Sequence, residues 1–97
     1  MPTQITQIDD AEREITIFRV DGEMFREDAE LVGKIAREAQ AASGYSIAID
    51  LADLDFLDSE SAAVLKKLEQ VEGFEITGTE IFLQTIVDAV EGHPRRT

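Results

Sequence analysis

The groups best placed for chemistry in this sequence form a short run of acidic and hydroxyl side chains, Asp58-Ser59-Glu60-Ser61, directly before an apolar helical pattern. A serine nucleophile needs a neighbouring base, most often a histidine. The single histidine, His93, lies close to the end of the chain, so the sequence offers no Ser-His-Asp triad. The same run is typical of a helix N-terminus, where Asp58 caps the first turn and Glu60 lies near the positive end of the helix dipole.

The other residues around this run give no metal or cofactor site. Asp50, Asp53, Asp55 and Asp58 lack the glycine and the terminal glutamate that a calcium-binding loop requires. The chain has no cysteine, which excludes thiolate metal ligands, disulfides and thiol redox chemistry. We therefore expect no catalytic residue, no metal and no cofactor, and a protein that is not an enzyme.

Length and charge narrow the class of partner. The chain has 97 residues, 43% of them hydrophobic, and a net charge of −12 from 21 acidic and 9 basic residues. Such a field repels nucleic acid and anionic lipid surfaces, whereas it favours a basic protein partner. The start of the chain does not resemble a signal peptide, and no apolar run is long enough to span a bilayer. We expect a cytoplasmic protein with one domain over residues 1–97, comprising a core at about 3–92 and a tail at 93–97.

Hydrophobic spacing predicts alternating strands and helices. The Asp21-Gly22 pair is expected to end the second strand. A link at 52–57 is expected to be irregular, with Leu54, Phe56 and Leu57 turned inward. The predicted strands cover 5–8, 14–20, 45–51 and 74–77, and the predicted helices cover 28–42, 59 to about 70, and 81–90.

The order β-β-α-β-α-β-α predicts a small α/β layer fold, a mixed four-stranded sheet packed with helices. Strand–helix–strand units favour parallel pairing with right-handed crossovers, while the short polar turn after the first strand favours antiparallel pairing at an edge. The strand at 45–51 is expected at the centre of the sheet, with Ile47, Ile49 and Leu51 packed against helices. The full strand order stays open.

Residues 47–62 resemble the most recognisable stretch of the STAS domain. In that family a buried strand ending in Asp-Leu leads through a hydrophobic link to Asp-Ser-Ser-Gly, or a close variant, at a helix start. Gly22-Glu23 is similar to the turn after the family's second strand, and residues 74–83 are similar to its last strand and helix. The likeness runs in unbroken order over about residues 3–92.

The resemblance implies a non-enzymatic regulatory module of the anti-sigma factor antagonist type, acting in signal transduction and transcription regulation. In such proteins the Asp-Ser-Ser-Gly corner contacts a kinase-like anti-sigma factor, which implies Asp58, Ser59, Glu60 and Ser61 as the partner-binding and regulatory residues here. Related domains serve in phospholipid-transport complexes and in anion transporters. An accessory subunit of a membrane transporter is therefore the alternative, and the partner and oligomeric state stay open.

The sequence departs from the family pattern at the switch position. Alignment on Asp58 places Glu60 where the family usually has its phosphoacceptor serine, and Ser61 where it usually has glycine. Glutamate has no hydroxyl to accept a phosphoryl group and is only a partial mimic of phosphoserine. Ser59 and Ser61 stay possible phosphoacceptors, and Ser59 is the better candidate because it directly follows Asp58. We expect both to serve as ordinary helix-start residues.

Overall fold

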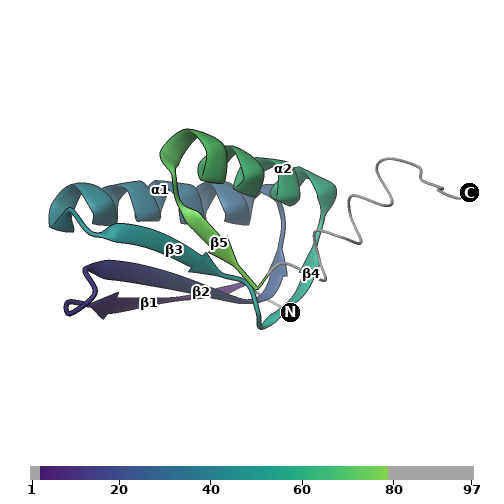
Figure 1. Ribbon diagram of the computed structural model, residues 1–97. Helices are drawn as coiled ribbons and strands as arrows, with labels where there is room; N and C mark the ends of the chain where they lie inside the picture. The colour runs from purple at the N-terminus through teal and green to yellow at the C-terminus, as the bar shows by residue number, and fades with distance from the viewer. Residues whose placement is uncertain (1–2, 79–97) are drawn as a thin grey trace, which may run out of the picture.

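The computed structural model describes residues 3–78, which form a sheet with both helices on one face (Figure 1). The α/β class is confirmed, whereas the helix predicted at 81–90 and the tail at 93–97 lie outside the described residues. In chain order the elements are β1 (Gln4–Asp10), β2 (Ile15–Met24), α1 (Arg26–Ser43), β3 (Ser46–Asp50), β4 (Leu54–Leu57), α2 (Ser59–Lys67), the π-helical turn η1 (Leu68–Glu72) and β5 (Glu75–Thr77).

The sheet has the order β1-β2-β3-β5, with β4 paired to the end of β2. β1 runs antiparallel to β2 at the edge, as predicted from the short turn between them. β3 runs parallel to β2 and to β5, because helical segments return the chain to the start of the sheet between these strands. β3 is therefore an interior strand, as expected.

Two sequence expectations about the end of β2 are wrong. The strand does not stop at Asp21-Gly22 but continues to Met24, and the link at 52–57 contains a fifth strand, β4, parallel to this extension. Gly22 has a φ of 88°, a value that glycine adopts without steric cost. It bends β2 where a stop was expected, and the bent end provides the edge on which β4 pairs.

Phe56 is not turned inward as predicted, because the pairing of β4 with β2 is irregular. Gly22 is opposite Leu54 and Glu23 is opposite Phe56, so Asp55 is an extra residue in the ladder. One extra residue in a strand moves the side chains of the residues that follow to the opposite face of the sheet. Leu54 is therefore buried, whereas Phe56 lies on the same outer side as Glu23 and is 43% exposed.

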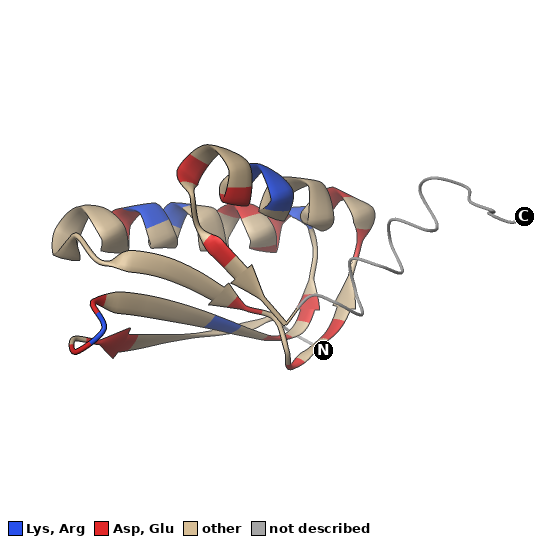
Figure 2. Ribbon diagram, viewed as in Figure 1, with Lys and Arg blue, Asp and Glu red and all other residues tan. Residues whose placement is uncertain are grey.

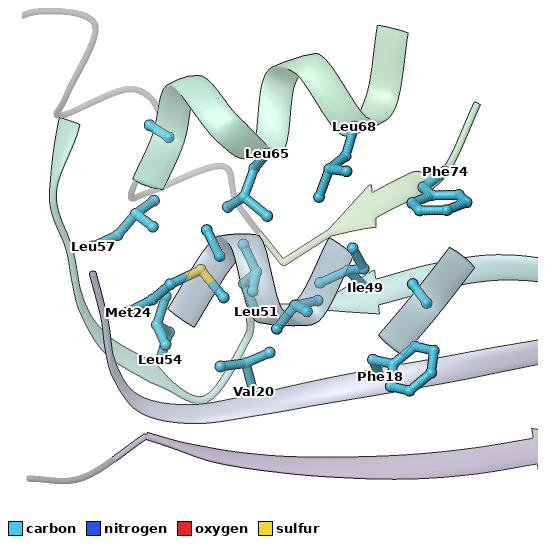
Figure 3. Packing of buried hydrophobic residues seen from close by; sticks show 14 of the residues in the cluster. Phe18, Val20, Met24, Ile49, Leu51, Leu54, Leu57, Leu65, Leu68 and Phe74 are labelled. Atoms are coloured by element: carbon cyan, nitrogen blue, oxygen red, sulfur yellow. The ribbon is translucent and has the colours of Figure 1, made fainter. Parts of the chain in front are cut away.

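The core lies between the sheet and the two helices. Ile47, Ile49 and Leu51 are all buried there, as predicted for the central strand and its end. Figure 3 shows Leu57 and Leu65 directed toward Met24 beneath the start of α2. The start of α2 is thus packed against the main core, and this packing fixes the position of α2 relative to β2. The largest fully buried apolar side chains are Phe18, Phe74, Met24, Ile49, Leu51, Leu65, Val20 and Val32.

Candidate functional site

The residues predicted for the site, Asp58 to Ser61, form one turn between β4 and the first residues of α2, hereafter the corner. Asp58 has extended backbone angles, and its Oδ1 accepts a hydrogen bond of 2.8 Å from the backbone N–H of Ser61. A carboxylate in this position satisfies an amide that has no partner within the helix. The structure confirms Asp58 as the N-cap of α2.

Ser61 faces the interior. It is fully buried, and its hydroxyl donates a hydrogen bond of 2.9 Å to the backbone carbonyl of Met24, the last residue of β2. The backbone N–H of Asp58 donates a longer bond of 3.4 Å to the same carbonyl. Both ends of the corner are therefore attached to β2, and the Ser61 hydroxyl already has a structural partner.

Ser59 and Glu60 face solvent on the first turn of α2. The structure thus brings all four predicted residues together but orients them differently: Ser59 and Glu60 outward, Asp58 half-buried as the cap, and Ser61 inward. Glu60 lies close to the free amides at the positive end of the helix dipole, where a negative charge is favourable. The accessible chemistry of the corner is one hydroxyl beside one carboxylate.

The N-terminus of α1 lies beside the corner, because α1 begins after β2 as α2 begins after β4. Phe25 is the N-cap of α1, and its backbone N–H donates a hydrogen bond of 2.9 Å to Oδ2 of Asp28. Glu27 adds a second carboxylate to this first turn. Two helix N-termini, each carrying acidic side chains, therefore occupy the carboxyl ends of paired parallel strands, the usual position of binding sites in α/β sheets.

Two aromatic rings that sequence reasoning did not assign to the site also lie here. The ring centroids of Phe25 and Phe56 are 5.4 Å apart with their planes inclined by 46°, and the two residues are 45% and 43% exposed. Contacts of this geometry are favourable between aromatic rings. Phe25 precedes the apolar stripe of the predicted helix and belongs to no strand pattern, which is the one sign in the sequence that it faces outward.

Arg26 is the only basic residue within residues 21–30 and 53–60, which contain nine acidic residues. Its Nε lies 3.0 Å from Oε2 of Glu30. The hydrogen bond that Arg26 donates to Glu30, together with the negative charges of Glu30 and Glu60, raises the pKa of the Arg26 guanidinium. Figure 2 shows acidic segments on β4 and at the start of α2, so this end of the molecule is predominantly negative.

Two further observations concern residues 3–78 alone. Their aspartate and glutamate side chains include no group of three or more arranged to hold a metal ion. Neither α1 nor α2 has the length and apolar character needed to cross a membrane.

Comparisons with solved structures show where this fold occurs elsewhere. An antisigma-factor antagonist STAS domain from Rhodobacter sphaeroides is 21% identical, with a TM-score of 0.54 over 79% of this chain and 87% of its own. The anti-sigma factor antagonist SpoIIAA in its unphosphorylated form is 18% identical, with a TM-score of 0.53 over 95% of this chain and 100% of its own. A DUF3478-family protein with a SpoIIAA-like fold, from Shewanella loihica PV-4, is 24% identical, with a TM-score of 0.56 over 91% of this chain and 75% of its own.

At these identities the likenesses establish a shared fold. No curated protein sequence matches the chain. The family model for the STAS domain matches residues 4–95, which is nearly the whole chain. The chain therefore belongs to the STAS domain family.

Proposed function

We propose that this protein is a non-enzymatic, cytoplasmic regulatory module of the anti-sigma factor antagonist type, and that it docks a kinase-like anti-sigma factor through the corner. The observation that carries the proposal is the exposure of Ser59 and Glu60 at a helix start that is attached to β2. An exposed turn held from beneath presents a defined surface to a partner. The family and the folds it shares support this class of function.

The same geometry supports an order between the two candidate phosphoacceptors. Ser59 is exposed, whereas Ser61 is fully buried and its hydroxyl donates to the Met24 carbonyl. A kinase would have to break that bond and open the corner to reach Ser61. We therefore propose that any phosphorylation of the corner occurs on Ser59, where the added dianion would lie beside Asp58 and Glu60 and be repelled by them.

The proposal is tested by co-purification followed by charge reversal. Tagged protein is expected to recover a kinase-like anti-sigma factor from native lysate, identified by mass spectrometry. Glu60→Lys is then expected to weaken that complex, because it reverses a charge at the contact and opposes the dipole of α2. Glu69→Lys is the matched control, since Glu69 is also exposed but lies in η1, beyond α2.

Equal affinity for the Glu60→Lys and Glu69→Lys proteins would move the interface away from the corner. Recovery of a transporter ATPase subunit in place of an anti-sigma factor would favour the alternative, in which the protein is an accessory subunit of a membrane transporter complex. Circular dichroism of both variants establishes that they are folded before affinities are compared.

A further inference from the structure

The exposed pair Phe25–Phe56, hereafter the aromatic pair, has no role in the core. Each of the two residues is close to half exposed, although burial of a phenylalanine side chain is strongly favourable. Phe56 is turned outward by the extra residue Asp55 in the β4 ladder, and Phe25 by its place at the helix cap. The backbone itself therefore directs both rings to the surface.

The aromatic pair is continuous with the corner. Phe56 lies two residues before the cap Asp58, and Phe25 directly follows Met24, whose carbonyl accepts the hydrogen bonds from Ser61 and Asp58. Apolar surface of this kind beside polar residues marks interaction sites, and aromatic side chains are enriched in the centres of protein interfaces.

The charge around the rings defines the chemistry of what can cover them. The two segments that carry the rings, residues 21–30 and 53–60, contain nine acidic residues, hereafter the acidic rim, and their one basic residue, Arg26, is already paired with Glu30. An acidic rim disfavours another acidic surface, including a second copy of this chain with its net charge of −12. It attracts lysine and arginine side chains.

We propose that the aromatic pair is the hot spot of the partner interface and receives an apolar side chain carried on a lysine- or arginine-rich segment of a protein. The apolar side chain covers the two rings, and the flanking cations meet the carboxylates of the rim. This inference rests on the proposed function in that it names the chemistry of the partner at the same surface. It assigns the principal contact to Phe25 and Phe56, outside the turn from Asp58 to Ser61.

The probe is a blocked hexapeptide of sequence KLKKLK, titrated into the full chain and followed by two-dimensional amide NMR. Saturable shifts are expected at Phe25, Phe56 and their neighbours. A KSKKSK peptide, which keeps the charge and removes the apolar anchor, is expected to bind about tenfold more weakly. An ELEELE peptide, which keeps the anchor and reverses the charge, is expected not to bind. Raising NaCl from about 50 to about 300 mM is expected to weaken KLKKLK binding, because exposed charges are screened.

Protein variants assign the contact. Phe56→Ala is expected to weaken KLKKLK binding by about fivefold or more, since truncating a central aromatic residue removes much of an interface's affinity. Val71→Ala is the matched control, because Val71 is a still more exposed apolar residue located in η1, at the other end of the α2 segment. Equal binding of KLKKLK and KSKKSK, shifts located elsewhere, or equal losses in the two variants would overturn the proposal.

The outcome is separable from that of the proposed function. If an anti-sigma factor binds and is lost with Glu60→Lys but not with Phe56→Ala, the corner is the interface and the aromatic hot spot is overturned. If no anti-sigma factor is recovered but KLKKLK binds at the aromatic pair, the hot spot stands and the identity proposed for the partner is wrong.

Discussion

The hydroxyl of Ser61, on the first turn of α2, donates a hydrogen bond of 2.9 Å to the backbone carbonyl of Met24 at the end of β2. The two residues are 37 positions apart, and Ser61 is fully buried. The alignment on Asp58 predicts that the family usually has glycine at this position, and glycine has no side chain to make such a bond. The Ser61 hydroxyl supplies an attachment between the corner and the sheet that a glycine could not.

Replacing Ser61 by alanine tests this attachment. The change removes a buried hydrogen bond and leaves the Met24 carbonyl with only the longer bond from Asp58, so we expect a loss of about 1 kcal/mol in the free energy of unfolding. Urea denaturation measures it. Ser59→Ala, an exposed change two residues away, should alter stability by less than about 0.5 kcal/mol. Equal effects of the two changes would mean that the bond to Met24 contributes nothing.

Asp58→Ala tests the cap of α2. The substitution removes the acceptor for the Ser61 amide and is expected to cost about 1 kcal/mol, while Asp58→Asn, which keeps an oxygen in place, should cost less. Both values come from chemical denaturation of the purified variants. A loss for asparagine as large as that for alanine would argue against the capping hydrogen bond as the source of the stability.

Truncation of Ile49 tests the centre of the core. Ile49 is completely buried in β3, so Ile49→Ala is expected to lower the free energy of unfolding by about 2–5 kcal/mol. Ile8→Ala provides the comparison, because Ile8 is 36% exposed on the edge strand β1 and has less apolar surface to lose. A change below about 0.5 kcal/mol for Ile49→Ala would contradict its burial.

Two glycines separate a backbone effect from a steric one. Gly44 and Gly78 have similar φ values of 77° and 73°, but a Cβ on Gly44 meets open space, whereas one on Gly78 lies 2.5 Å from the backbone nitrogen of Ala52. Gly44→Ala is expected to cost roughly 1–2 kcal/mol from its φ alone. Gly78→Ala should cost about 1–3 kcal/mol more, because the backbone of Ala52 must move. Similar melting temperatures for the two variants would contradict the close approach.

The phosphorylation state of the corner is a prediction from the alignment. Because Glu60 occupies the usual phosphoacceptor position, we expect no stoichiometric phosphate on this protein after incubation with its kinase-like partner, as measured by phosphopeptide mass spectrometry. Glu60→Ser is expected to introduce a modifiable residue. Stoichiometric phosphate on Ser59 of the unaltered protein would refute the expectation, and failure to modify Glu60→Ser would place the error in the alignment or in the choice of partner.

Features with local causes could be predicted from the sequence. The continuous apolar run at 45–51 predicted the interior strand, because a strand buried on both faces has apolar residues at successive positions. The spacing of apolar residues at 28–42 predicted α1, because a helix buried on one face has them three and four positions apart. Asp58 could be recognised as a cap because its role depends only on the residues that follow it. The family resemblance then located the candidate site on the same turn.

Features that depend on pairing between distant segments could not be predicted. β4 exists because β2 continues past Gly22, and neither strand alone indicates that the two pair. Phe56 faces outward because of an irregularity in that ladder, and the sequence of β4 alone does not show which of its side chains face the core. The bond between Ser61 and the Met24 carbonyl involves a backbone group, which carries no mark in the sequence.

The attachment of the corner to Met24 also affects the entropy of association. A turn that becomes ordered only in a complex loses conformational freedom on binding, and that loss reduces affinity. Here the turn is already held by two bonds to one carbonyl and by the packing of Leu57 beneath it, before any partner arrives. Its geometry is therefore preorganised, and its affinity for a partner depends on the contacts formed with little cost for rearranging the backbone.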